Sequence, residues 1–381
     1  MSKIAVDDIT DAAGTGAPNF PNGATGLPEP FSYTAVSGAA QALDVGSHNF
    51  FDAGTLTADT TVSFSNVPTE ARWSYSFKAG VDEGYVLSLA TLQSIYDMPQ
   101  NGFWTGHFFK PDGTKIYITD QDSDAVFQFT LLTAWDLSTA SYDSVSFSVA
   151  AQDLNPNGVF FKPDGTKMYI IGYSSDRIYQ YTLSTAWDLN TASYDSVSFS
   201  CVAQENTPMS VFFKPDGTKM YLVGWGGQSI YQYTLSTAWV VSSASYDSVS
   251  FNVAGQSPST TGVFFSNDGT KMFVCGVTNT GVYEYTLSTA WAVNTASYAS
   301  VFFSIGGTPQ EVSFSENGEK MFVLRSGNQD IVGYGTSAYT SLTLPSSVVN
   351  PPYGSLTSSE RVSFNFWTSD GGTTVNYGSA F

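Results

Sequence analysis

The sequence predicts an all-β protein whose main part is a five-bladed β-propeller inserted into a small discontinuous β-sandwich. Two markers recur along the chain at a constant spacing, which indicates a repeat architecture. Each repeat contains four segments with strand character, as a propeller blade does. The two ends of the repeat array complement each other, which favours a closed ring over an open array with exposed edges.

The first marker is a hairpin corner. Phe-Phe-Lys-Pro-Asp-Gly-Thr-Lys occupies 108–115, returns unchanged at 160–167 and 212–219, and has altered forms at 264–271 and 313–320. Asp-Gly supplies the backbone geometry of a tight hairpin, so the corner joins two antiparallel strands. The second marker, Thr-Ala-Trp, recurs at a spacing of 52 residues (187 − 135 = 52), with its indole at Trp135, Trp187, Trp239 and Trp291.

One repeat reads as four strands in series. The first strand covers 159–161, the corner at 163–165 follows, and the second strand covers 167–171. The third strand, 177–183, and the fourth, 196–202, both alternate apolar and polar residues with the period of two that strands require. We therefore expect each repeat to form one four-stranded antiparallel blade.

The ends of the array predict how the ring closes. The last repeat has a first strand at 312–314, a second at 320–324 and a third at 331–334, but no fourth. A strand without a repeat of its own precedes the array near 85–89, and we expect it to complete the last blade. This gives five blades with an N-terminal closing strand.

The segments outside the repeats also have strand character. We expect residues 40–82 and 336–381 to form the two halves of one β-sandwich, because a ring at 83–335 brings its own ends together and leaves the host halves adjacent. Neither half is long enough for a comfortable core alone. Residues 1–39 form a separate N-terminal segment.

Composition sets limits on function. The net charge is 14 − 33 = −19, and only 12% of the residues are charged, while 42% are hydrophobic. A core of that size excludes disorder for most of the chain, and the lack of clustered Lys and Arg argues against nucleic acid as a partner. No run of 18 apolar residues predicts membrane insertion, and the acidic start lacks the apolar core of a secretory signal, so we expect synthesis in a cytoplasm.

Cysteine and histidine offer little chemistry. Cys201 and Cys275 stand where sibling repeats carry aliphatic residues, so we expect both to be buried without a disulfide. His48 is isolated, and His107 replaces a Val of the other repeats, which argues against a role as a metal ligand. No cofactor is predicted.

The outer segments resemble proteins of tailed bacteriophage virions, especially tail fibres. Residues 12–23 (Ala-Ala-Gly-Thr-Gly-Ala-Pro-Asn-Phe-Pro-Asn-Gly), behind a Lys-Ile-x-Val-Asp start, resemble the N-terminal segment of many such proteins. Residues 43–51 with 56–66 resemble the first half of a small β-domain common in these fibres, and 344–348 with 368–374 resemble its second half. In the family the two halves are usually nearly contiguous, so this chain departs by carrying a propeller between them.

The resemblance implies a function as a virion appendage protein, assembled in the host cytoplasm and located in the virion. It implies that residues 1–39 anchor the chain to other virion proteins, with Thr15, Pro18, Phe20 and Pro21 as the anchoring residues. It also implies a homotrimer. The propeller would then face a glycan or protein of the host cell surface.

The loops indicate where a partner could bind. The corners and the Trp-bearing loops are nearly uniform and lie on one face of the ring, whereas the loops on the opposite face differ in every repeat, including a long one at 91–105. Drift of unrestrained loops explains this, and so does binding by loops on a rigid scaffold. The candidate binding residues suit a saccharide or a flat protein epitope, and are Tyr96, Phe103, Trp104, Asp153, Asn155, Tyr173, Glu205, Trp225 and Asn279.

Three alternatives stay open. The spacing of Asp120, Asp122 and Asp124 opens like a calcium loop but lacks the later Gly and acidic residue. Some five-bladed propellers are glycoside hydrolases with carboxylates on their inner strands. Here Glu311 is the only acid that heads an inner strand, and Asp153 and Glu205, which occupy equivalent loop positions, show no acid/base division of roles, so we expect no enzyme. Thirdly, the protein could be a purely structural or decorating protein of the capsid or tail.

Overall fold

The computed structural model describes residues 84–99 and 101–336 in full and, outside them, only strand segments between 33 and 79 and between 342 and 380. The chain divides into two compact units, one of residues 83–337 and one formed by 1–82 together with 338–381. The predicted anchoring residues Thr15, Pro18, Phe20 and Pro21, and also His48, lie outside the described residues. Within the described part, no helix has the length and apolarity needed to cross a bilayer.

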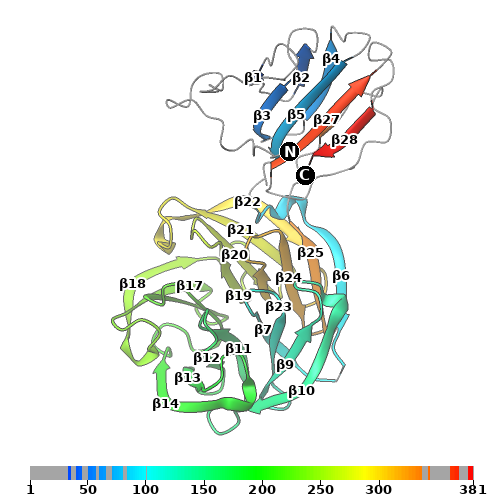
Figure 1. The fold of residues 1–381 in the computed structure, drawn as a ribbon. Coiled ribbons are helices and arrows are strands. Elements are labelled where there is room, and N and C mark those ends of the chain that lie inside the picture. The colour runs from blue at the N-terminus through cyan, green and yellow to red at the C-terminus, as the bar shows by residue number, and fades with distance from the viewer. Residues whose placement is uncertain are drawn as a thin grey trace. The chain divides into compact units, whose positions relative to one another are not determined.

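The larger unit is a five-bladed β-propeller, as predicted (Figure 1). Each blade has four antiparallel strands, a to d, with strand a innermost. Blades 1 and 2 consist of β7 (Trp104–Phe109), β8 (Lys115–Asp120), β9 (Ala125–Leu131), β10 (Ala140–Ser148), β11 (Pro156–Phe161), β12 (Lys167–Gly172), β13 (Arg177–Leu183) and β14 (Ala192–Ser200). Blades 3 and 4 consist of β15 (Pro208–Phe213), β16 (Lys219–Gly224), β17 (Ser229–Leu235), β18 (Ala244–Asn252), β19 (Thr260–Phe265), β20 (Lys271–Gly276), β21 (Gly281–Leu287) and β22 (Ala296–Ser304).

Blade 5 is completed by the N-terminal side of the unit. It consists of β23 (Pro309–Phe314), β24 (Lys320–Arg325), β25 (Asp330–Gly335) and, as its outer strand, β6 (Thr91–Asp97). β6 pairs with β25 from Thr91 opposite Gly335 to Asp97 opposite Asp330, and Figure 1 shows the two strands side by side, cyan beside orange. The ring therefore closes as expected.

The closing strand lies six residues further along the chain than predicted. Residues 85–89, predicted as this strand, instead hold Tyr85 and the 3-10 helix η2 (Leu87–Leu89). Tyr85 has a φ of 71°, and its N–H donates to the Gly318 carbonyl, as the Trp135 N–H does to the Gly113 carbonyl. Tyr85 thus replaces the missing Trp of blade 5, so residues 85–89 correspond to the end of a c–d connection and β6 follows them.

The outer strand d of blade 2 begins earlier than the sequence indicated. In blade 2 it starts at Ala192 rather than 196, because a bulge opposite Gln180 and Tyr181 admits extra residues and places Ser196 at a φ of 57°. The c–d connections contain the remaining 3-10 helices, η3 (Leu137–Thr139), η4 (Leu189–Thr191), η5 (Val241–Ser243) and η6 (Val293–Thr295).

The recurring Trp fastens each blade to its neighbour. The indole of Trp187 lies over Gly165, which has a φ of 75° and whose position leaves no space for a Cβ. The Trp187 carbonyl accepts a hydrogen bond of 2.6 Å from Tyr117 of blade 1, and the same bond recurs from blade 2 to 3 and from blade 3 to 4. Trp187 itself has a φ of 67°, a conformation that costs a non-glycine residue about 1 kcal/mol. The stacking of its indole on Gly165 offsets this cost.

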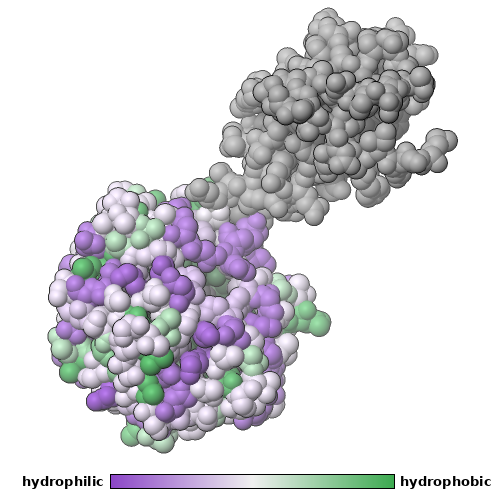
Figure 2. Space-filling view, turned by 60° about the vertical axis from the view of Figure 1, so that its left-hand side comes forward, coloured by the Kyte–Doolittle hydropathy of each residue, from purple (hydrophilic) through white to green (hydrophobic). Residues whose placement is uncertain are grey.

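The core consists of the interfaces between blades. A typical cluster joins Tyr169, Ile171 and Cys201 of blade 2 to Val211 and Phe213 of blade 3. Both cysteines are free and fully buried, as predicted. The outer strands expose mainly Ser, and in the view of Figure 2 hydrophobic residues form only small separate patches on a mostly polar surface.

The second unit combines strands from both sides of the propeller in the sequence. One sheet has the order β1 (Tyr33–Ala35), β3 (Phe50–Leu56), β5 (Ala71–Ala79), β27 (Arg361–Thr368) and β28 (Asn376–Ala380). The other has the order β2 (Ala40–Asp44), β4 (Thr60–Ser65) and β26 (Leu342–Thr343). β5 and β27 pair antiparallel over eight residues, so the chain re-enters the sheet that it left before the propeller.

Candidate binding face

The loop face is the propeller face that carries the b–c and d–a loops. In every blade the residue after strand b donates its N–H to a carbonyl of the preceding d–a loop, over 3.0 to 3.2 Å. The donors and acceptors are Gln121 to Phe103, Tyr173 to Asn155, Trp225 to Thr207, Val277 to Ser259 and Ser326 to Thr308. The five donors are equivalent positions, so residue differences among them change the side chains and keep the backbone bond.

Two of these loops are fixed by hydrogen bonds from their backbone N–H groups to a buried carboxylate. Asp153 is 3% exposed and accepts hydrogen bonds from the N–H groups of Asn155 (2.8 Å), Ser175 (2.9 Å) and Ser174 (3.3 Å). A carboxylate that satisfies three backbone donors orders the loop and has little capacity left for a ligand. Asp153 was predicted as a binding residue, and this part of the prediction is wrong.

Glu205 has the same role one blade further on. It is 1% exposed and accepts from the N–H groups of Thr207, Gly226 and Gly227, each at 2.9 Å. Its carboxylate lies where a Cβ at Gly224 would be, so the glycine makes room for it. Glu205 is likewise corrected from a contact residue to a support for the b–c loop of blade 3.

Three aromatic side chains stand exposed on these supported loops. Tyr173 is 36% exposed, Trp225 39% and Phe103 44%. Tyr173 and Trp225 occupy equivalent positions in the adjacent blades 2 and 3, and Phe103 lies on the d–a loop that enters blade 1. Large exposed aromatics on a fixed backbone can contact a partner with little loss of conformational entropy.

Polar and aliphatic side chains accompany the aromatics. Asn155 is half-buried and donates to Ser174, and Asn279 is exposed and donates to the Gln256 carbonyl. Sequence reasoning missed Leu154 and Val202, which are exposed on the d–a loops of the same face. The sequence does indicate that Leu154 is exposed, because the equivalent position before blade 3 holds the polar residue Asn206.

Two predicted contact residues belong to the blades. Trp104 is 1% exposed because it begins inner strand β7 and packs edge-on against Phe127 at 5.3 Å. Tyr96 lies in β6 and packs against Phe129, so neither belongs to a loop at 91–105. The d–a loop between blade 5 and blade 1 is 98–103, and Met98 within it is buried in the core.

The loop face is acidic. The ten b–c and d–a loops contain no Lys or Arg, and they contain Asp122, Asp124, Asp153, Asp176 and Glu205. Partial burial and the carboxylates of Asp153 and Glu205 raise the pKa of Asp176, and partial burial with Asp153 and Asp120 raises the pKa of Asp124. These shifts indicate a negative local potential, which favours neutral or cationic partners.

The structure does not assemble the predicted calcium loop. Asp120 is buried, and its carboxylate accepts from the Asp122 N–H (3.3 Å) and the Ser123 hydroxyl (2.6 Å) of its own loop. Among the described residues, no three His, Cys, Asp or Glu side chains form a group that could hold a metal ion. The Asp120, Asp122 and Asp124 interpretation is therefore wrong, and their spacing reflects turn formation.

The Glu311 carboxyl group is buried and bonds a residue of another inner strand. Glu311 accepts from the Ser210 hydroxyl at 2.6 Å and from the Val312 N–H at 3.1 Å, and it reaches across Gly262, where a Cβ would crowd its carboxyl oxygen. Burial raises the pKa of Glu311 to about 8, so the group is mostly protonated at neutral pH. It is 6% exposed, which leaves little access for a substrate.

A buried histidine lies on the next inner strand. His107 Nε2 is 2.6 Å from the Ser313 hydroxyl oxygen, and burial lowers the pKa of His107 to about 3. Its Nδ1 has no hydrogen-bond partner among the described residues. The neutral imidazole joins the inner strands of blades 1 and 5 through Ser313, and it shares no hydrogen bond with Glu311.

Comparisons with known proteins give information on the fold and on nothing else. No family model matches the chain, and no curated protein matches it. Among solved structures, two proteins titled "putative 6-phosphogluconolactonase" are similar: one from Bacteroides uniformis (14% identity, 56% of this chain and 61% of that one, TM-score 0.39) and one from Bacteroides fragilis (13%, 58% and 76%, 0.41). A functionally unknown protein from Desulfotomaculum acetoxidans is similar at 10% identity over 60% of this chain and 64% of that one, with a TM-score of 0.39. The chain spans less than two thirds of the Bacteroides uniformis and Desulfotomaculum chains, and no activity is carried over from such distant likenesses.

Proposed function

We propose that this chain is a non-enzymatic binding protein of a phage virion appendage, and that its propeller presents the loop face to a host-surface saccharide. The observation that carries the binding role is the construction of that face. Its loops are tied by five equivalent backbone bonds and by buried carboxylates, while Tyr173 and Trp225 remain exposed at equivalent positions. The virion location rests on the resemblance of the outer segments to tail-fibre proteins.

The chemistry of the face narrows the saccharide. Aromatic rings stack on the apolar faces of sugar rings, and two such rings on neighbouring blades offer two stacking positions to a polysaccharide. The surrounding carboxylates would repel an acidic polysaccharide, because like charges placed opposite each other oppose association. Neutral or amino-sugar polymers therefore fit best.

The test is binding of the full chain to an array of bacterial surface glycans. Trp225→Ala and Tyr173→Ala should each weaken binding to the strongest glycan by about tenfold or more, the loss typical of a central aromatic contact. The matched control is Leu132→Ala, because Leu132 is 90% exposed on the opposite face and should leave binding unchanged. If no glycan binds, or if the control loses as much as Trp225→Ala, the proposal is wrong.

A further inference from the structure

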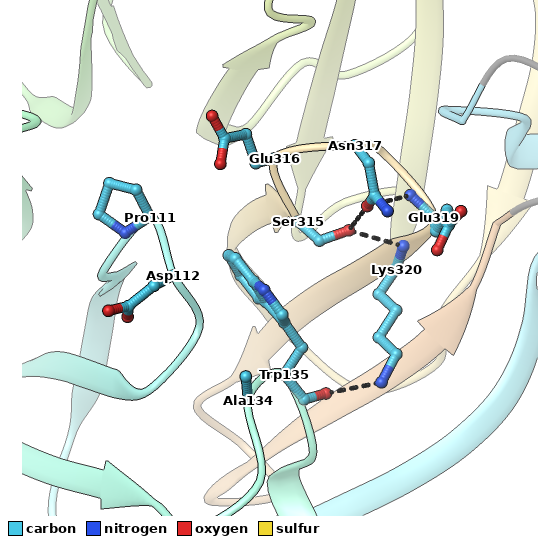
Figure 3. Close-up of a pocket in the computed structure, with 9 residues that line it drawn as sticks. All are labelled: Pro111, Asp112, Ala134, Trp135, Ser315, Glu316, Asn317, Glu319 and Lys320. Carbon is cyan, nitrogen blue, oxygen red and sulfur yellow. Dashed lines mark hydrogen bonds between the residues drawn. The ribbon is translucent and has the colours of Figure 1, made fainter. Parts of the chain in front are cut away.

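A pocket of about 510 Å³ lies on the corner face, which is the propeller face opposite the loop face. It is formed where the a–b corner of blade 5 meets blade 1 (Figure 3). The indole of Trp135 forms a wall, and Figure 3 shows it between Asp112 of the blade 1 corner and Lys320 of blade 5. This pocket is separate from the loop face and has no part in the function proposed above.

The pocket lies beside a corner position at which blades 1, 2 and 3 carry a lysine. The corners of blades 1, 2 and 3 begin with Lys110, Lys162 and Lys214, and each ammonium pairs with the corner Asp at 2.6 or 2.7 Å. The corner of blade 5 has Ser315 at this position, and its hydroxyl is engaged with Asn317 (2.8 Å) and with the Lys320 N–H (3.0 Å). Serine thus leaves the volume of an alkylammonium chain unfilled beside an indole.

The blade 5 corner also gains negative charge. Glu316 replaces the corner Pro and Glu319 replaces the corner Thr, so the charge of the corner changes from +1 (two Lys, one Asp) to −1 (one Lys, two Glu). The Lys320 ammonium donates to the Trp135 carbonyl at 3.0 Å, and neither glutamate has an ion-pair partner among the described residues.

The backbone of this corner is well fixed. The Glu316 carbonyl accepts hydrogen bonds from Asn267 (2.5 Å) and from the Tyr85 hydroxyl (3.2 Å), both from outside the corner. The Trp135 ring stacks on Phe322 of blade 5 at 5.9 Å, so the wall of the pocket is fixed as well. A ligand would meet a preformed site and would not have to order it.

We propose that this pocket binds an aliphatic primary ammonium group, with the alkyl chain against Trp135 and the ammonium attracted by the negative charge of Glu316 and Glu319, which Figure 3 shows on opposite sides of the corner. The ligand would supply the ammonium group that the corners of blades 1, 2 and 3 take from their own chain. An aromatic face and uncompensated carboxylates both attract an organic cation. The group could belong to a free diamine or to the lysine side chain of another protein, and the test separates these sources.

The test uses the full chain and two probes, cadaverine and the amide of Nα-acetyl-lysine, followed by ligand-observed NMR titration. For so small a ligand we expect a Kd of about 1 mM. Ser315→Lys should weaken binding at least about tenfold by filling the pocket, and the double variant Glu316→Gln/Glu319→Gln should weaken it about fivefold or more. The matched control Ser266→Lys makes the same change at the corner of blade 4, outside the pocket, and should bind like the wild type.

The outcomes divide as follows. Preference for cadaverine supports a free amine, and preference for the lysine amide supports a partner side chain. Failure of both probes to saturate, equal binding of 1,5-pentanediol, or wild-type binding by Ser315→Lys overturns the proposal. Ser315→Lys introduces the residue that three sibling corners already carry, so we expect it to fold, and its melting temperature checks this.

Discussion

Glu311 allows the most quantitative test of the ring. The other inner strands carry Gly106, Gly158, Ser210 and Gly262 at its position, so one carboxyl group occupies space that the other four residues leave. Glu311→Gln keeps the shape of the side chain and its hydrogen-bond acceptor, and it removes the titration. The variant therefore isolates the free-energy cost of ionising a carboxyl group at the centre of the propeller.

The magnitude follows from the shift in pKa. The ordinary value is 4.5 and burial raises the pKa of Glu311 to about 8. Between these values the folded protein holds a proton that the unfolded chain has lost, so its stability falls as pH rises. A difference of about 3.5 pKa units corresponds to about 5 kcal/mol at 1.36 kcal/mol per unit. The contribution is present in full below pH 4.5 and is lost by about pH 8.

The assay is denaturant unfolding from pH 4.5 to 8.5, followed by tryptophan fluorescence. The free energy of unfolding of Glu311→Gln should exceed that of the wild type by an amount that grows with pH, towards about 5 kcal/mol. Glu316→Gln, at an exposed position, is the control and should run parallel to the wild type. Parallel profiles for the wild type and Glu311→Gln would refute the buried, protonated carboxyl.

Three further predictions concern the scaffold. Gly165→Ala places a Cβ against an indole at positive φ and should lower stability by about 1 kcal/mol or more, whereas Gly255→Ala, with no atom within 4 Å of its Cβ, should be nearly neutral in thermal unfolding. His107→Val should resist acid better than the wild type, because the folded-state pKa of about 3 lies below the ordinary 6.5 and stability is lost as pH falls between them; acid titration by circular dichroism measures this. Asp153→Ala leaves three loop N–H groups without their acceptor and should cost about 1–3 kcal/mol and speed proteolysis of that loop, whereas Asp122→Ala at an exposed position should do neither.

The ring could be predicted from the sequence because its repeats are copies. The Asp-Gly corner and Thr-Ala-Trp report local turn geometry that each blade needs, and their recurrence fixes the blade count. The closing strand was misplaced because Tyr85 fills the position of a Trp without sharing its Thr-Ala context. Tyr85 covers Gly318 as Trp135 covers Gly113. This equivalence of Tyr85 and Trp135 is visible only in the three-dimensional structure.

The candidate face was only partly predictable. Tyr173 and Trp225 were found because they follow a recognisable strand end, but exposure cannot be read from residue type, and Trp104 is as aromatic as Trp225. The spacing does place Trp104 on an inner strand, since it precedes the Phe-Phe pair by four residues as Pro156 does in the next blade. The opposite error occurred with Asp153, a loop acid that is buried because backbone N–H groups surround it.

The most direct test of the loop-face account is amide hydrogen exchange of the full chain with and without the glycan that binds it most strongly on the array. The account predicts new protection confined to the loop face, chiefly at 173–176 and 225–228 of blades 2 and 3. The a–b corners, such as 163–165, should exchange at the same rate in both states. Protection at the corners with none at the two loops would contradict the account.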